Sequence, residues 1–190
     1  MRSDSRRFRF LEMAAAAIVA LAMTASAPAR ADDANAAKAR ALVQSAINMS
    51  DSDQAVKSLW QATNIDPTLN EAYVYLGLYY NSRSDFSNVV NVYKKMAKYE
   101  PKQPTIYLNI GEAYMSFSPP KLGDALTYYR KAYQLDPNSS FAALRIGEIL
   151  AQQGDRDGAI KFLKQAAADA AKNPNTASQA RKALAQMGAM

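Results

Sequence analysis

The stretch YLNIGEAY, Tyr107 to Tyr114, decides the fold of this chain. An aromatic residue, an aliphatic residue, a glycine and a second aromatic residue stand at positions 107, 110, 111 and 114. At the spacing of an α-helix these four positions share one face. Glycine on such a face leaves room for a second helix to approach closely. The segment therefore predicts one helix of a closely packed helix pair.

The same pattern occurs 34 residues earlier, in YVYLGLYY at residues 73–80. An acid followed by proline then recurs at Asp66-Pro67, Glu100-Pro101 and Asp136-Pro137, with spacings of 34 and 36 residues between the prolines. Proline pushes the residue before it out of the helical region, so each pair ends a helix. A period of 34 residues is typical of a repeat of two helices.

Alignment on these prolines predicts four repeats, near 36–69, 70–103, 104–139 and 140–175, in an array over 32–175. The fourth lacks its proline at Ala171, and Pro174 comes three residues late. The first repeat matches weakly, which leaves open whether it is a true repeat. Pro104 is expected at a first helical position, and capping boxes are expected from Thr68 and Thr176.

These residues resemble the tetratricopeptide-repeat family over roughly 36–171. The resemblance implies an all-α protein, a right-handed α-solenoid of about four helix-turn-helix units. A final helix within 176–190, expected from Thr176 to Met187, would cover the last repeat, because the ends of an array need adapted surfaces.

The resemblance also implies that the first helix of each repeat lines a concave groove. Residues of these helices that the core does not use predict a half-apolar groove for an extended segment or an amphipathic helix of a partner. The predicted groove residues are Val74, Leu78, Asn81, Leu108, Asn109, Glu112, Met115, Phe141, Leu144, Arg145 and Glu148. The alternative is that some of them pack against the neighbouring repeat. Apolar side chains at most positions where relatives place lysine or arginine argue against a clamp for a C-terminal carboxylate.

Catalysis finds little support in the sequence. The chain has no cysteine and no histidine, which excludes thiol nucleophiles, disulfides, histidine-based triads and most zinc sites. Glu112 and Glu148 occupy equivalent positions of successive repeats and should lie close together, but a groove edge or a contact to a partner's basic residue explains them better than acid–base chemistry. We expect no enzyme activity, no cofactor and no metal.

Residues 1–31 have the three zones of a secretory signal peptide. Arg2, Arg6, Arg7 and Arg9 precede the apolar stretch Met13–Met23, and Ala29-Arg30-Ala31 offers a cleavage site before Asp32. An uncleaved membrane anchor is the alternative, but a membrane span needs about 20 apolar residues. We expect cleavage after Ala31 and a periplasmic or secreted protein.

The sequence thus predicts a non-catalytic adaptor of the bacterial envelope that binds another protein or peptide. A self-associating structural subunit and a glycan- or peptide-binding accessory of an envelope enzyme stay open as alternatives, as does a homo-oligomer. The net charge of +6 lies partly in the signal segment, so nucleic acid is not expected as a partner. Membrane contact is expected only through that segment.

Overall fold

The computed structural model describes residues 32–189, so the predicted signal segment lies outside the described residues. The described chain is all-α, as predicted, and contains no strand. Its helices are α2 (Asp32–Asn48), α3 (Ser52–Ile65), α4 (Asn70–Ser82), α5 (Phe86–Tyr99), α6 (Pro104–Met115), α7 (Leu122–Leu135), α8 (Ser140–Gln152), α9 (Arg156–Ala168) and α10 (Pro174–Gln186). Among these residues, no helix has the length and apolar character needed to cross a membrane.

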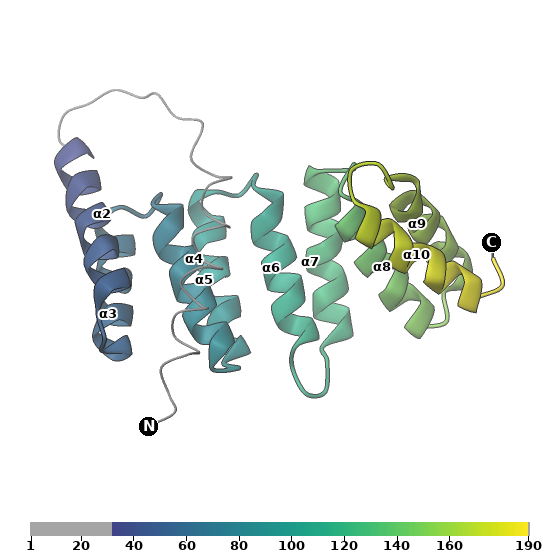
Figure 1. The fold of residues 1–190 in the computed structure, drawn as a ribbon, viewed down its shortest axis with the longest axis horizontal. Coiled ribbons are helices and arrows are strands. Elements are labelled where there is room, and N and C mark those ends of the chain that lie inside the picture. Colours follow the sequence, from purple (N-terminus) through teal and green to yellow (C-terminus); the bar gives the residue numbers. More distant parts are fainter. Residues whose placement is uncertain (1–31, 190) are drawn as a thin grey trace. The chain divides into compact units, whose positions relative to one another are not determined.

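The chain divides into two compact units, and the first comprises the described residues up to Tyr79. Within it α2 packs against α3 (Figure 1). Asp51 caps α3, since its carboxylate accepts hydrogen bonds from the backbone N–H groups of Asp53 and Gln54 at 2.9 and 3.1 Å. The Tyr79 hydroxyl of α4 donates to the Asp53 carboxylate at 3.0 Å and ties α4 to the start of α3.

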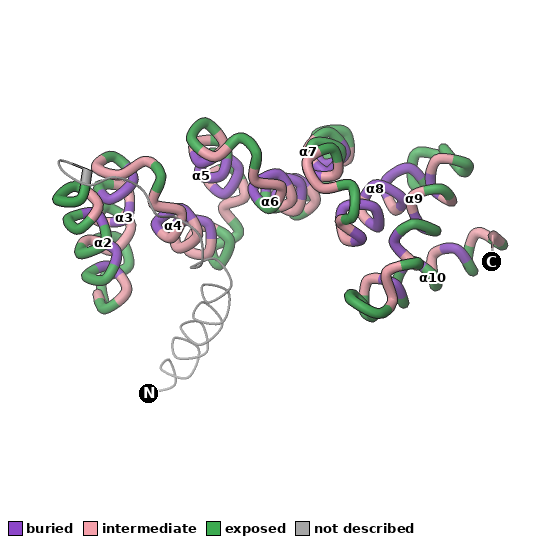
Figure 2. The backbone as a smooth tube through the Cα atoms, turned by 90° about the horizontal axis from the view of Figure 1, so that it is seen from above, coloured by how far each residue is buried: buried purple, intermediate pink, exposed green. Residues whose placement is uncertain are grey.

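The second unit begins at Tyr80 and contains α5 to α10. Each helix packs against the next along the chain, and α10 also contacts α8 (Figure 1). The short turns after α5 and α7 contain Pro101 and Pro137, as the acid–proline pairs predict. Buried positions follow the faces that neighbouring helices share, and α8 is buried along most of its length (Figure 2).

Two glycines allow the close approach of paired helices that the sequence predicts. A Cβ atom added to Gly111 of α6 would lie 2.5 Å from a ring carbon of Tyr129 on α7. A Cβ atom added to Gly147 of α8 would lie 2.7 Å from Cγ of Leu163 on α9. Both distances are too short for any side chain, so glycine sets the separation of these two helix pairs.

Of the three helix starts that the sequence predicts, one is confirmed and two are wrong. Pro104 is the first residue of α6, as expected. The capping box from Thr68 is wrong, because the Thr68 hydroxyl donates to the Asp66 carboxylate at 2.7 Å and α4 begins only at Asn70. The capping box from Thr176 is also wrong, because α10 begins at Pro174 after Asn173. In both places a local turn or a proline takes precedence over the threonine.

Candidate partner-binding surface

A charged network joins the first helices of successive helix pairs in the second unit. Arg145 of α8 donates two hydrogen bonds to the carboxylate of Glu112 of α6, from Nε at 2.8 Å and from Nη2 at 3.0 Å. It donates a third, from Nη1, to Glu148 one turn further along α8 at 3.0 Å. The Tyr129 hydroxyl of α7 donates to the same Glu112 carboxylate at 2.5 Å. Two-point contact between guanidinium and carboxylate holds both helices in register.

This network brings two helix faces together. Leu108, Glu112 and Met115 share one face of α6, since they stand three or four residues apart. Phe141, Arg145 and Glu148 share one face of α8 for the same reason. All six side chains are partly exposed. We call these six residues the α6–α8 face. It combines apolar and charged groups.

The carboxylates of the network favour the charged form of Arg145. Burial acts to lower the pKa of Arg145, but the hydrogen bonds and charges of Glu112 and Glu148 outweigh burial and raise it above its usual range. Burial, with the hydrogen bond to Glu112, raises the pKa of Tyr129. The arginine therefore stays charged and the tyrosine stays protonated at any physiological pH.

The network also limits what Glu112 can do. The Glu112 carboxylate already accepts two hydrogen bonds from Arg145 and one from Tyr129. Donors that are fixed in this way occupy the carboxylate oxygens and leave them little access to a substrate proton. The predicted proximity of Glu112 and Glu148 is confirmed, with Arg145 between them. The geometry supports the groove-edge interpretation rather than acid–base chemistry.

Phe141 packs beside the network. The guanidinium carbon of Arg145 lies 5.0 Å from the centre of the Phe141 ring, within the range of a cation–π contact. The ring remains partly exposed. An exposed aromatic ring beside a fixed charge suits a contact with a partner, because aromatic residues bury a large area with little loss of side-chain entropy.

Leu144 requires a correction. The sequence predicts that it lines the groove, but its side chain is only 1 % exposed. It belongs to a cluster with Leu163 of α9 and Leu184 of α10, among others. Helix α10 covers the face of α8 that a further repeat would otherwise cover, so the alternative of packing against a neighbour holds for this residue. Leu144 is a core residue and is not available to a partner.

Four other predicted groove residues are at least partly exposed but do not belong to the α6–α8 face. Val74 and Leu78 are half-buried on α4 in the first unit. Asn81 is exposed near the end of the same helix, and Asn109 is exposed on α6. The structure joins six of the predicted residues in the α6–α8 face, and these four take no part in the hydrogen bonds of Arg145 that hold that face together.

Sequence reasoning missed a second feature of this unit. A pocket lies between the turn after α7 and the turn after α9, and Asp136, Asp169 and Lys172 line it. The turn after α9 runs from Asp169 to Asn173, one residue longer than the turn from Asp136 to Ser139 after α7. The missing proline at Ala171 was the available signal for an altered turn.

Comparisons with known proteins agree with this architecture. The family model described as tetratricopeptide repeat matches residues 121–187. No curated protein gave a significant match.

Several solved structures have similar folds. A thermophilic TPR protein of Thermus thermophilus, TTC0263, has 22% identity and a TM-score of 0.55, with 84% of each chain covered. A structure of MamA has 16% identity and a TM-score of 0.59, with 86% of this chain and 88% of that chain covered. The TPR2B domain of yeast Sti1, in a complex with pHsp70, has 24% identity and a TM-score of 0.50, with 59% of this chain and 95% of that chain covered. Residues 121–187 therefore match the tetratricopeptide repeat, and the described chain has an all-α solenoid fold like that of these solved structures.

Proposed function

We propose that this protein is a non-catalytic scaffold of the bacterial envelope that holds a segment of a partner protein against the α6–α8 face. The observation that carries the proposal is the Glu112–Arg145 contact, at 2.8 Å, which joins two partly exposed half-apolar helix faces into one surface. Tetratricopeptide repeats form protein-interaction modules, and the Sti1 domain of similar fold was solved in a complex. The location follows from the signal-peptide pattern of residues 1–31.

The α6–α8 face suits an extended segment or a helix rather than a small molecule. Leu108, Met115 and Phe141 offer apolar contacts at separate points along two helices. Arg145 and its carboxylate partners lie among them and supply fixed polar groups that set the direction of a bound segment. Specific recognition of this kind places a few anchors around a pre-organised polar centre.

Site-specific crosslinking tests the proposal. A photoreactive amino acid at Leu108, in the full-length protein expressed in its own cells, should capture one partner that mass spectrometry of the envelope fraction identifies. The same amino acid at Lys164, an exposed residue on the second helix of its pair, is the matched control and should not capture that partner.

A substitution in the α6–α8 face should prevent binding of the partner and leave the fold intact. Phe141→Asp, placed in the chain that carries the crosslinker at Leu108, should abolish capture while the circular dichroism spectrum stays helical. Equal capture from positions 108 and 164, or capture of only a second copy of this chain, would contradict the proposal. The second result would move self-association ahead of the scaffold role.

A further inference from the structure

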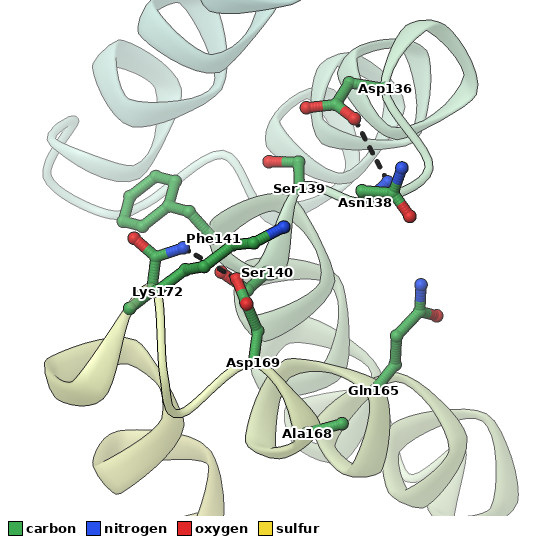
Figure 3. Close-up of a pocket in the computed structure, with 10 residues that line it drawn as sticks. Asp136, Asn138, Ser139, Ser140, Phe141, Gln165, Ala168, Asp169 and Lys172 are labelled. Carbon is green, nitrogen blue, oxygen red and sulfur yellow. Dashed lines mark hydrogen bonds between the residues drawn. The ribbon is translucent and has the colours of Figure 1, made fainter.

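The pocket beside α8 contains charges that no other described residue neutralises. It has a volume of about 510 Å³, within the range of about 300–1,000 Å³ of ligand-binding pockets. Figure 3 shows Asp136 on one side of it, Phe141 with Lys172 on the other, and Asp169 below them. In the second unit Arg145 forms ion pairs with Glu112 and Glu148. Within the described chain, by contrast, the three charged residues of the pocket form no ion pair.

The hydrogen bonds of the pocket leave capacity for a ligand. Asp136 accepts one bond, from the backbone N–H of Asn138 at 3.1 Å, and Asp169 accepts one, from the side chain of Asn173 at 2.7 Å. Each carboxylate therefore keeps an oxygen without a donor. Ser140 lines the pocket although it is only 4 % exposed, and no hydrogen bond of its hydroxyl is found among the described residues. A nearly buried hydroxyl that faces a cavity without a partner is available to a ligand.

Gln165 forms the rigid wall of the pocket. Its side-chain amide donates to the Pro137 carbonyl at 2.8 Å, and its oxygen accepts from the Tyr133 hydroxyl at 2.6 Å. These bonds join α9 to the end of α7 and to the turn that follows it. The two carboxylates are therefore carried by turns whose separation is held in the folded protein, as pre-organised recognition requires.

Helix dipoles do not decide the charge of the ligand, because they oppose one another here. Helices α7 and α9 end at the pocket, which favours cations, and helices α8 and α10 begin there, which favours anions. The charges of the side chains that line the pocket therefore decide the charge of the ligand. Two carboxylates against one ammonium leave one negative charge, and the Phe141 ring lining the pocket already packs against one guanidinium, that of Arg145.

From this arrangement we infer that the pocket binds a lysine or arginine side chain of the partner segment, between the carboxylates of Asp136 and Asp169 and along the ring of Phe141. The inference rests on the proposed function, since the ligand is part of that partner. Lys172 also lines the pocket, and its positive charge repels the incoming cation. It is exposed and unpaired, so it swings away into solvent when the partner's side chain enters.

The charge of the ligand is tested with capped tripeptides in an NMR titration of the full chain at low salt. Acetyl-Ala-Arg-Ala-amide should shift the backbone signals of residues 136–141 and 165–173 in a saturable way, with a Kd on the order of 1 mM. Acetyl-Ala-Glu-Ala-amide should not. Saturable binding of the glutamate peptide at these signals, or no saturable shift with the arginine peptide, overturns the inference.

Three variants that keep the shape of the side chain nearly unchanged test the assignment. Whether Lys172→Gln tightens or weakens binding of the arginine peptide is decisive. Asp136→Asn and Asp169→Asn keep an oxygen for their local hydrogen bonds, and each should weaken binding of the arginine peptide by about threefold to tenfold. Lys172→Gln should tighten it by about threefold, because the repelling charge is gone. Asp157→Asn, an exposed residue outside the pocket, removes the same charge and should change Kd by less than about twofold. Weaker binding by Lys172→Gln overturns the inference.

The partner captured through Leu108 separates this inference from the proposed function. If capture is lost in the Asp136→Asn, Asp169→Asn double variant and kept in Asp157→Asn, the pocket contributes to partner binding. If the partner is captured equally by the double variant, the pocket inference fails and the scaffold role stands. If no partner is captured by the unmodified protein, the scaffold role fails, whatever the tripeptides do.

Discussion

At the scale of single residues, Tyr129 links packing to the candidate surface. Its ring fills the space over Gly111, and its hydroxyl donates to Glu112 at 2.5 Å. The side chain is fully buried. A change that displaces this ring therefore disturbs both the contact between α6 and α7 and the network around Arg145. The close approach of α6 and α7 at Gly111 thus also affects the α6–α8 face, because Tyr129 contacts Glu112.

Gly111→Ala should lower the free energy of unfolding. The added methyl group would meet ring carbons of Tyr129 at 2.5–2.9 Å. Overpacking costs about 1–3 kcal/mol, which exceeds the about 0.5–1 kcal/mol that alanine gains over glycine within a helix. Urea unfolding followed by circular dichroism measures the difference.

The control for this substitution is Gly123→Ala, because a Cβ atom there meets nothing within 4 Å. Its stability should stay the same or rise by up to about 1 kcal/mol. An unchanged stability of Gly111→Ala, with Gly123→Ala equally unchanged, would contradict the packing assigned to Tyr129.

Stability should also fall at high pH because of Tyr93. Burial raises the pKa of its phenol to about 12 from 10.0. Between these values the unfolded chain has lost the proton while the folded chain keeps it, so stability is full below pH 10 and declines as pH rises toward 12. The slope from this one group is about 1.4 kcal/mol per pH unit.

Tyr93→Phe tests that slope in urea unfolding between about pH 9 and 11.5. It should remove the contribution of one group, and the unmodified chain gives the reference slope. The same slope in Tyr93→Phe and in the unmodified chain would show that the Tyr93 phenol is not the titrating group.

At the scale of helices, α10 packs against both α8 and α9. Leu184 is 5 % exposed and packs in the cluster that contains Leu144 and Leu163. Arg181 of α10 donates to the Ala167 carbonyl at 3.2 Å, and Arg156 donates to the Met187 carbonyl. Helix α10 thus packs on α8 and α9 through apolar contacts, and hydrogen bonds of two arginines hold it against α9. It supplies the surface that a following repeat would otherwise provide.

Leu184→Ala should lower the free energy of unfolding by about 2–3 kcal/mol, because it leaves a cavity over Leu144. Gln186→Ala, an exposed residue two positions further on, should change it by less than about 0.5 kcal/mol. Chemical denaturation checks both values. Similar small losses in both variants would mean that α10 does not cover the core.

At the scale of the whole molecule, burial differs strongly between helix α2 of the first unit and helix α8 of the second. Helix α2 of the first unit buries only Ala39, Val43 and Ala46, two of which are alanines. Helix α8 of the second unit buries Leu144 and Ile146, together with most of its other residues. In a repeat array each element is stabilised mainly by its neighbours, so local stability follows local burial.

Hydrogen exchange of the full chain should therefore show faster exchange in α2 than in α8. The expected difference follows from local opening of the less buried helix rather than from global unfolding. Mass spectrometry of peptides from 32–48 and 140–152 gives the comparison. Equal protection in both segments would mean that α2 and α8 open as one cooperative unit.

The sequence by itself determined the helical fold class and the ends of α3, α5 and α7 at the acid–proline pairs, since helical periodicity and proline act over a few residues. Pro104 begins α6 and Gly111 marks a close helix pair, as predicted. The capping box predicted at Thr68 is wrong, because the threonine hydroxyl finds a nearer acceptor in the Asp66 side chain within the turn. Such competition between local hydrogen bonds depends on coordinates rather than on residue type.

The tertiary structure decided which side chains remain for a partner. Arg145 and Glu112 stand 33 positions apart, and only the packing of α6, α7 and α8 brings them within 2.8 Å. Leu144 looks like Leu108 in the sequence, yet α10 buries the first and leaves the second partly exposed. The pocket between Asp136 and Asp169 likewise forms between two turns that are distant in the chain. Periodicity specifies each helix face, but the neighbour that covers a face is selected by contacts among distant segments.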